Sequence, residues 1–115
     1  MAKRASVLTK VKALCLALPE TKLTMTWGKP HFRVGEKIFA GCSDDGDPPT
    51  IGFKLTKPHQ AQVIKRPGFE RAKYVGRHGW VSMDASRVKD WDEVRAWIHE
   101  SYSLIAPKRL VPSGH

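Results

Sequence analysis

Cysteine is scarce in this sequence, with Cys15 and Cys42 as its two examples among 115 residues. Small secreted domains that depend on disulfides usually carry more, so a disulfide framework is not expected. We expect both thiols to be reduced and buried as small hydrophobic groups. No uncharged apolar run approaches the roughly 18 residues that a membrane-spanning helix needs, and Lys10 and Lys12 interrupt the apolar N-terminal stretch. Without a membrane segment or a signal peptide, the sequence predicts a cytoplasmic protein.

Familiar catalytic and metal-binding motifs are also missing. The sequence has no GxxxxGKS/T, strand-linked GxGxxG, GxSxG or HExxH motif. Its histidines lack the i+3 or i+4 spacing of a metal site, and the acidic run at 44–47 lacks the glycine position and final glutamate of a calcium loop. Cys42 could face His31 across a hairpin as a nucleophile and its base, but a cysteine in an alternating strand is more often a core residue. We therefore expect no enzyme activity, no metal and no cofactor.

Acidic residues are few, because 11 Asp and Glu stand against 20 Lys and Arg, giving a formal charge of +9 and a pI near 9.9. The excess is greatest over residues 51–89, where nine basic and two acidic residues give a net charge of +7. Such a segment favours a polyanion as partner, although charge carries no information on sequence-specific binding. The nine basic residues are Lys54, Lys57, Lys65, Arg66, Arg71, Lys73, Arg77, Arg87 and Lys89.

Apolar residues at helical spacing predict two helices in the first two thirds of the chain. A six-residue stripe indicates a helix over Val7–Leu18, with Ser6 as its N-cap and Pro19 at its end. A second, shorter helix begins after Thr56, which is a suitable N-cap, and has Pro58 in its first turn. The apolar stripe of the first helix is expected to face the core.

A third helix is predicted at the C-terminal end. Its apolar stripe extends over Trp91–Ile105, and Asp90 with Glu93 has the spacing of a capping box. Pro107 ends this helix, and Lys108–His115 is expected to be a loose tail.

Between the first two helices the apolar period changes to two, which predicts antiparallel strands with one buried face. The element order α-β-β-β-β-α-β-β-α favours an α+β fold, with a single antiparallel sheet and helices packed on one face. We expect one domain over residues 1–106, followed by a tail over 107–115. The expected strands are Thr24–Trp27, His31–Val34, Lys37–Ser43, Thr50–Leu55, an extended Phe69–Tyr74 and Trp80–Met83.

Several motifs resemble one known family. Residues 27–34 (WGKPHFRV), followed by KIFA at 37–40, resemble the WGxPxFxV and KxFA signature of the MmcQ/YjbR family. Each motif is weak by itself, but their order and spacing are fairly specific, and the resemblance covers roughly residues 5–106. The later features that agree in order are Pro49-Thr50, Phe53-Lys54, Tyr74, Trp80-Val81 and Ser101-Tyr102.

The resemblance implies a CyaY-like fold, in agreement with the topology above, and a small bacterial DNA-binding protein with a double-wing motif. Similarity of fold does not establish function, and the family offers no catalytic residue to carry over. Two features depart from these expectations. The loop Asp44–Asp47 carries three acids, which as a wing tip would repel phosphates. Iron binding of the CyaY kind would need an acidic first helix, whereas this one carries Lys10 and Lys12.

Two groups of candidate binding residues follow from the charge and the aromatic pattern. Arginine can pair bidentately with phosphate and stack on bases, and Lys54 is expected on the solvent-facing side of its strand, as a phosphate contact or a solvated charge. The nucleic-acid-binding candidates are Lys54, Arg66, Arg71, Lys73, Arg77 and His78. The candidates for binding a small ligand or a protein partner are Trp27, His31, Tyr74 and Trp80.

The aromatic candidates have a structural alternative. Trp27 and Phe32 could be stacking platforms or could anchor a strand corner in the core, and the Tyr74–Trp80 loop could bind a polyanion, bind a small ligand or bury its aromatic rings. The leading hypothesis is a non-enzymatic DNA-binding protein, expected to be a monomer, with phosphate contacts from the basic segment. The second is an adaptor that binds a small ligand or a protein through the corner around Trp27 and the Tyr74–Trp80 loop.

Overall fold

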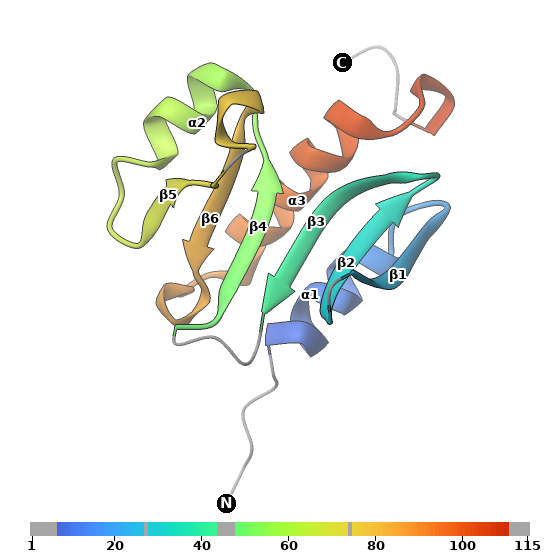
Figure 1. Ribbon diagram of the computed structural model, residues 1–115, viewed down its shortest axis with the longest axis horizontal. Helices are drawn as coiled ribbons and strands as arrows, with labels where there is room; N and C mark the ends of the chain where they lie inside the picture. The colour runs from blue at the N-terminus through green and yellow to red at the C-terminus, as the bar shows by residue number, and fades with distance from the viewer. Residues whose placement is uncertain (1–6, 27, 44–47, 74, 111–115) are drawn as a thin grey trace, which may run out of the picture.

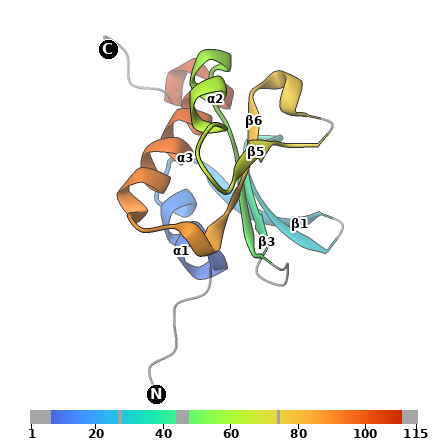
Figure 2. The ribbon, with the colours of Figure 1, turned by 90° about the vertical axis from the view of Figure 1, so that its left-hand side faces the viewer.

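The structure, a computed structural model, describes residues 7–26, 28–43, 48–73 and 75–110. Within them, one antiparallel sheet has the strand order β1-β2-β3-β4-β6-β5. Helices α1 (Val7–Leu16) and α3 (Trp91–Ile105) cover one face of this sheet, and no α-helix of the described residues lies on the opposite, uncovered face (Figures 1 and 2). The other elements are β1 (Thr21–Thr26), β2 (Lys29–Val34), β3 (Lys37–Ser43), β4 (Thr50–Lys54), α2 (Lys57–Val63), β5 (Phe69–Arg71) and β6 (Trp80–Asp84).

The observed element order confirms the predicted α+β fold with helices on one face of an antiparallel sheet. Several boundaries differ from the prediction: β1 begins at Thr21 rather than Thr24, β4 and β5 end at Lys54 and Arg71, and β6 extends to Asp84. Helix α1 ends at Leu16. The Thr21 hydroxyl lies 2.9 Å from the carbonyl oxygens of both Cys15 and Leu18, so it supplies a hydrogen-bond donor to carbonyl groups at the end of the helix. Gly28 adopts φ 77° between β1 and β2, so the first hairpin turns tightly and β2 already begins at Lys29.

The predicted caps are partly confirmed. Thr56 caps α2 by accepting a hydrogen bond from the His59 amide, and Asp90 caps α3 by accepting one from the Asp92 amide at 2.9 Å. The capping box itself is wrong, because the Glu93 carboxylate binds Arg66 and does not turn back to Asp90. Ser6 lies outside the described residues.

The expected loose tail is wrong over its first residues. Lys108–Leu110 forms a 3₁₀ turn, and the Arg109 guanidinium binds the Glu20 carboxylate at 2.6 and 2.9 Å. Leu110 packs against the core. The C-terminal turn is therefore attached to the domain, while residues 111–115 lie outside the described part of the chain.

The core lies between the sheet and the helices α1 and α3. Alternation of buried and half-buried residues in β4 and β6 points one side chain in two toward the helices, as the sequence pattern predicts. Phe53 stacks on Trp97, with ring centroids 5.4 Å apart, and Phe32 is completely buried. Both cysteines are buried thiols that are not joined in a disulfide, as predicted, and burial raises the pKa of the Cys15 thiol. Because Cys42 is in this core, it does not share a face with His31.

Candidate binding site on the uncovered face of the sheet

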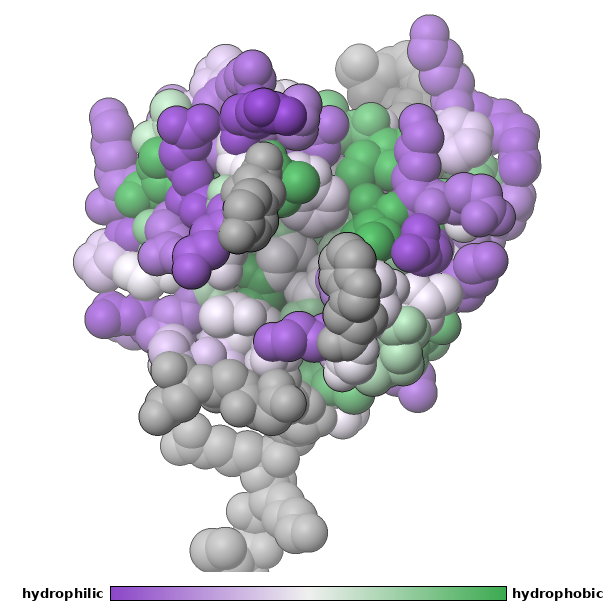
Figure 3. Space-filling view, viewed as in Figure 1, coloured by the Kyte–Doolittle hydropathy of each residue, from purple (hydrophilic) through white to green (hydrophobic). Residues whose placement is uncertain are grey.

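The face of the sheet that carries no helix is hollowed into a groove of about 490 Å³. Strand pairing joins Gly41 to both His31 and Gly52, and Gly52 to Ser82, so these four residues lie side by side on this face. The β1–β2 hairpin and the connection from β5 to β6 both project away from the helices (Figure 2). Lys29 and His31 of the hairpin and Ala72 and Val75 of the connection line the groove. Figure 3 views the molecule onto the uncovered face, and there hydrophilic residues gather on both flanks of a paler and more hydrophobic centre.

The floor of the groove is backbone, because two glycines pair with each other across β3 and β4. A Cβ on Gly41 would lie 3.0 Å from Cδ2 of His31, so the imidazole sits directly over that glycine. A Cβ on Gly52 would meet nothing closer than the Val81 carbonyl oxygen at 3.8 Å, so this position opens into the groove. Glycine inside a strand often marks such a close approach of a ligand or another backbone.

His31 forms one wall of the groove, next to Lys29 and Ile38. Its Nδ1 lies 3.1 Å from the Lys29 carbonyl oxygen, which can only accept, so Nδ1 carries the proton and donates it. The Nε2 atom is then the acceptor of the neutral ring. The histidine therefore presents a planar ring and one hydrogen-bonding nitrogen beside the glycine floor.

Trp80 forms the opposite wall, together with Ala72 and Val75. Gly79 adopts φ 101°, and its carbonyl oxygen accepts a hydrogen bond from the Leu55 amide at 2.9 Å. A Cβ on Gly79 would lie 2.1 Å from the Leu55 carbonyl oxygen, so only glycine lets the start of β6 come this close to β4. This contact fixes where the indole enters the groove.

Gln60 on α2 forms hydrogen bonds to the same connection between β5 and β6. Its side chain is buried, and Nε2 donates to the carbonyl oxygens of Gly76 at 2.7 Å and of Trp80 at 2.9 Å. Each of these carbonyl oxygens also accepts a backbone amide, Gly79 for Gly76 and Ala72 for Trp80, so the buried Gln60 amide adds a second hydrogen bond to both acceptors. Sequence reasoning missed Gln60, because a single glutamine on a short helix carries no distinctive signal.

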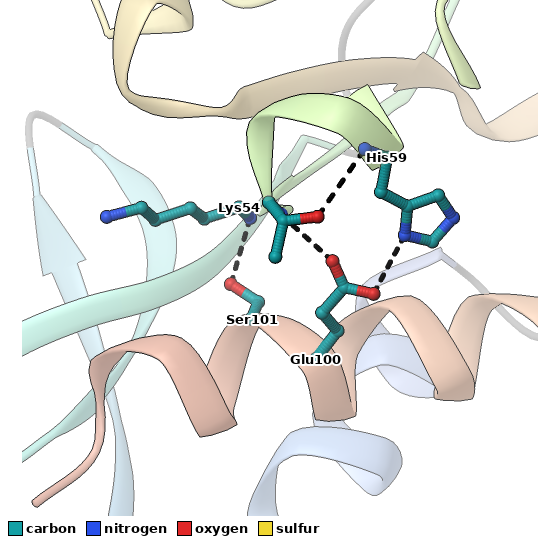
Figure 4. A network of polar contacts seen from close by, with 5 residues as sticks. Lys54, His59, Glu100 and Ser101 are labelled. Carbon is teal, nitrogen blue, oxygen red and sulfur yellow. Dashed lines mark hydrogen bonds and ion pairs between the residues drawn. The ribbon is translucent and has the colours of Figure 1, made fainter. Parts of the chain in front are cut away.

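A polar network from α3 positions the end of β4, where Lys54 lies (Figure 4). The completely buried Ser101 hydroxyl donates to the Phe39 carbonyl oxygen at 2.5 Å and accepts from the Lys54 amide at 2.9 Å. The neighbouring Glu100 carboxylate accepts from the Thr56 amide at 2.9 Å and binds Nδ1 of His59 at 2.8 Å. These contacts join α3 to β4 and to the start of α2, so the backbone that carries Lys54 is firmly held.

The structure separates the predicted nucleic-acid contacts into two places. Lys54 is half-buried and pairs in register with Trp80, on the uncovered face as predicted. Arg71, Lys73, Arg77 and His78 are exposed along β5 and the connection that follows it, next to the Trp80 wall. The His78 Nε2 atom accepts a hydrogen bond from Arg77 Nε at 3.3 Å. Of these five, strand register places Lys54 on the uncovered face. Arg71 pairs with the core residue Val81, so its side chain lies on the helix-covered side of the edge strand β5, and Lys73, Arg77 and His78 follow in the connection to β6.

Arg66 is the sixth candidate, and it lies apart from the others. Its guanidinium binds the Glu93 carboxylate at 2.7 and 3.0 Å and stands over the rings of Phe69 and Trp97, 5.0 and 5.3 Å from their centroids. These contacts line a second cavity of about 420 Å³, beside α3. The hydrogen bond from Arg66 holds the pKa of Glu93 below its ordinary value. Arg66 therefore acts as a packing and pairing residue in this structure.

Of the predicted ligand-binding residues, His31 and Trp80 face each other across the same groove. Trp27 and Tyr74 lie outside the described residues, as does the acidic loop at 44–47. Sequence reasoning missed the paired glycines of the floor and Val75, whose side chain is 41% exposed at the edge of the groove. Glycines inside two neighbouring strands were the signal that could have revealed the floor.

The residues that the structure describes form neither a metal site nor a membrane-spanning helix. No group of three or more His, Cys, Asp or Glu side chains there could hold a metal ion. No helix in the described ranges is both long enough and apolar enough to span a bilayer.

Comparison with known proteins assigns the family. A family model for YjbR matches residues 16–104, so the chain belongs to the YjbR family. A search of curated protein sequences finds no match. The fold is similar to the crystal structure of a Deinococcus radiodurans protein with a DUF419 domain, with a TM-score of 0.81, 14% identity and coverage of 96% of this chain and 92% of that one.

A second solved structure, a protein from Pseudomonas syringae, is similar over 75% of this chain and 87% of its own, with a TM-score of 0.63 and 20% identity. At these identities both likenesses concern the fold. The family and the fold are therefore established, and the chemistry of the groove has to be argued from its residues.

Proposed function

We propose that this YjbR-family protein is a non-enzymatic DNA-binding protein that holds phosphates with cations on the uncovered face of the sheet and along its β5 edge. The proposed contacts are Lys54, Arg71, Lys73 and Arg77, with Lys29 at the opposite wall. Phosphate contacts of this kind supply affinity and position the nucleic acid, but they do not read its sequence. We expect affinity without strong sequence preference.

The observation that carries this proposal is the distribution of ion pairs. Arg66, Arg95 and Arg109 each bind a carboxylate on the helix side or at the chain ends, and Arg87 binds Asp84 at the end of β6. None of the five proposed contacts has an ion-pair partner among the residues that the structure describes. Lys10 and Lys12 on α1 share this property, and what distinguishes the groove is that no carboxylate is among its described lining residues. Positive charge that the fold leaves unbalanced attracts a polyanion.

One acidic side chain limits where a strand of DNA can lie. Glu70 is exposed on β5 and pairs in register with Ser82, so it belongs to the same face as the groove. A phosphate close to this carboxylate would be repelled. The path of the backbone should therefore follow the Lys54 side of Trp80 and the connection after β5, away from Glu70.

The test is fluorescence anisotropy with two unrelated DNA duplexes over a series of salt concentrations. The triple variant Arg71→Gln, Lys73→Gln and Arg77→Gln should weaken binding equally for both duplexes, because phosphates carry no base identity. The slope of log K against log salt should flatten by roughly 0.9 for each lost contact, or about 2.7 in all. An unchanged slope would show that the site is elsewhere.

A matched control removes the same charge from the opposite layer. Lys10, Lys12 and Arg95 are exposed on α1 and α3. Their replacement by Gln lowers the net charge by three, as in the first triple variant, but it should leave the salt slope almost unchanged. Equal effects of the two triple variants would indicate attraction to the whole basic protein and would contradict a located surface.

A small-ligand site is the second candidate function, because His31 and Trp80 enclose a groove of ligand size. Salt dependence separates the two candidates. Binding to a pocket should change little with salt, whereas binding through several phosphates should fall steeply.

A further inference from the structure

We propose that the groove holds one unstacked nucleobase of a DNA strand, so that the protein prefers single-stranded or locally opened DNA to an intact duplex. This inference rests on the proposed DNA-binding function. It assigns separate tasks to the two groups of residues: the cations hold phosphates, and the groove between His31 and Trp80 holds a base.

The shape of the groove favours a single flat ring. Its volume of about 490 Å³ is in the range of small-molecule pockets, about 300–1,000 Å³. The imidazole of His31 covers Gly41, but Gly52 is open, so a planar group can lie close to the strand there, beside that ring. The bases of an intact duplex are stacked inside the helix and cannot enter a concave pocket, whereas a single strand can turn a base outward.

The lining of the groove fits a base chemically. Trp80 supplies an aromatic face, Ile38 and Val75 supply apolar edges, and the Ser82 hydroxyl and His31 Nε2 can hydrogen-bond to the edge of a base. These contacts are tolerant of base identity, because every base has an aromatic face. They predict a preference for bases over bare backbone rather than for one sequence.

The charge of the surroundings favours a nucleotide over a neutral aromatic molecule. Lys29 lines the groove, and Lys54 is paired in register with the Trp80 wall. No described residue that lines the groove carries a carboxylate. A base in the groove would therefore have its adjoining phosphates near unbalanced cations on both sides.

The decisive comparison uses two strands with the same number of phosphates. One is a 12-mer of deoxythymidine, and the other is a 12-residue abasic strand of identical backbone charge. We expect the deoxythymidine strand to bind about tenfold more tightly, as removal of one stacked base commonly costs. A 12-base-pair duplex should also bind more weakly than the deoxythymidine strand. Free thymidine monophosphate should bind more weakly still, because it reaches fewer cations.

Filling the groove tests its location. Gly52→Val adds a β-branched side chain where a Cβ meets no close atom, so the strand should accept it, and the added methyl groups should occupy the floor. This variant should bind both 12-residue strands equally, at the affinity of the abasic strand. The control Ser103→Val adds similar bulk at an exposed position of α3 and should keep the tenfold preference. Trp80→Leu, which removes the stacking face, serves as the second variant if Gly52→Val does not fold.

The outcomes separate this inference from the proposed function. Equal affinity of the wild-type protein for the deoxythymidine and abasic strands would overturn the base site and leave phosphate binding intact. Absence of binding to any DNA at low salt would overturn both proposals. Thymidine monophosphate binding as tightly as the 12-mer would show a pocket for a free nucleotide and would overturn the strand as its occupant. Retained preference in both groove variants would overturn the placement.

Discussion

Ser101 on α3 accepts a hydrogen bond from the backbone amide of Lys54 on β4, at 2.9 Å. The pairing of β3 with β4 extends from Ser43↔Thr50 to Ala40↔Phe53 and stops there. Beyond that point the Ser101 hydroxyl also donates to the Phe39 carbonyl oxygen, so one side chain bridges the two strands where they separate. The Ser101 hydroxyl therefore replaces a direct hydrogen bond between β3 and β4, next to the proposed phosphate-binding residue Lys54.

Replacing Ser101 with Ala should destabilise the protein. The substitution leaves the Lys54 amide and the Phe39 carbonyl oxygen without their partner, at a cost of about 1–3 kcal/mol. Urea denaturation measures this loss. Ser103→Ala, at an exposed position two residues further along the same helix, should change stability by no more than about 0.5 kcal/mol. Equal stability of the two variants would refute the bridging role.

Phe32→Ala should cost about 3–5 kcal/mol, because the ring is completely buried and its loss leaves a cavity. A small domain has only about 5–15 kcal/mol of stability, so much of the protein would unfold on modest heating. Thermal melting followed by circular dichroism checks this. Met25→Ala on the neighbouring strand is the control, since that side chain is 63% exposed. A Phe32 variant that melts like wild type would contradict the burial of this ring in the core.

Two glycines that face different surroundings should respond differently to the same change. Gly79→Ala forces a Cβ against the Leu55 carbonyl oxygen in a backbone with φ 101°, so we expect a loss of more than about 1 kcal/mol. Gly52→Ala meets no close atom and should be nearly neutral. Chemical denaturation of both variants decides the matter, and a tolerated Gly79→Ala would contradict the close contact between β4 and β6.

The pair of Arg66 and Glu93 should contribute stability at neutral pH and lose it in acid. The hydrogen bond from Arg66 lowers the folded-state pKa of Glu93 below its ordinary value of 4.5. A carboxyl with a lowered pKa stabilises the fold above its unfolded pKa, and this contribution disappears as the pH falls through the folded value. Glu93→Gln should therefore be less stable than wild type at pH 7, and the difference should shrink as the pH falls below 4.5 and through the lowered folded-state pKa. Because both side chains are about half exposed, the effect should be small and should weaken with salt.

Local patterns in the sequence predict most of the fold. Each of β4, β6 and α3 buries one face. Their apolar residues therefore recur with the period of a strand or of a helix, and this period can be recognised in the sequence. The N-caps Thr56 and Asp90 are likewise recognisable, since they bond to amides only two or three residues away.

The features that escaped prediction depend on partners distant in the chain. Arg66 looks like a free cation until the fold brings Glu93, 27 positions later, against it. Ser101 reaches Phe39 across 62 positions, and no local pattern shows that its hydroxyl is buried. The groove floor consists of absent side chains at Gly41 and Gly52, whose meeting depends on the register of two strands. His31 and Trp80 were thus predicted as binding residues, but the groove that they line together was not.

The salt dependence of DNA binding by the wild-type protein tests the central claim most directly. Anisotropy titrations of a labelled DNA duplex between low and physiological salt give the slope of log K against log salt. If Lys29, Lys54, Arg71, Lys73 and Arg77 each contact one phosphate, the slope should be about −4.5. Such a slope would support phosphate binding by this face of the sheet. No detectable binding at low salt, or an affinity that does not change with salt, would contradict it.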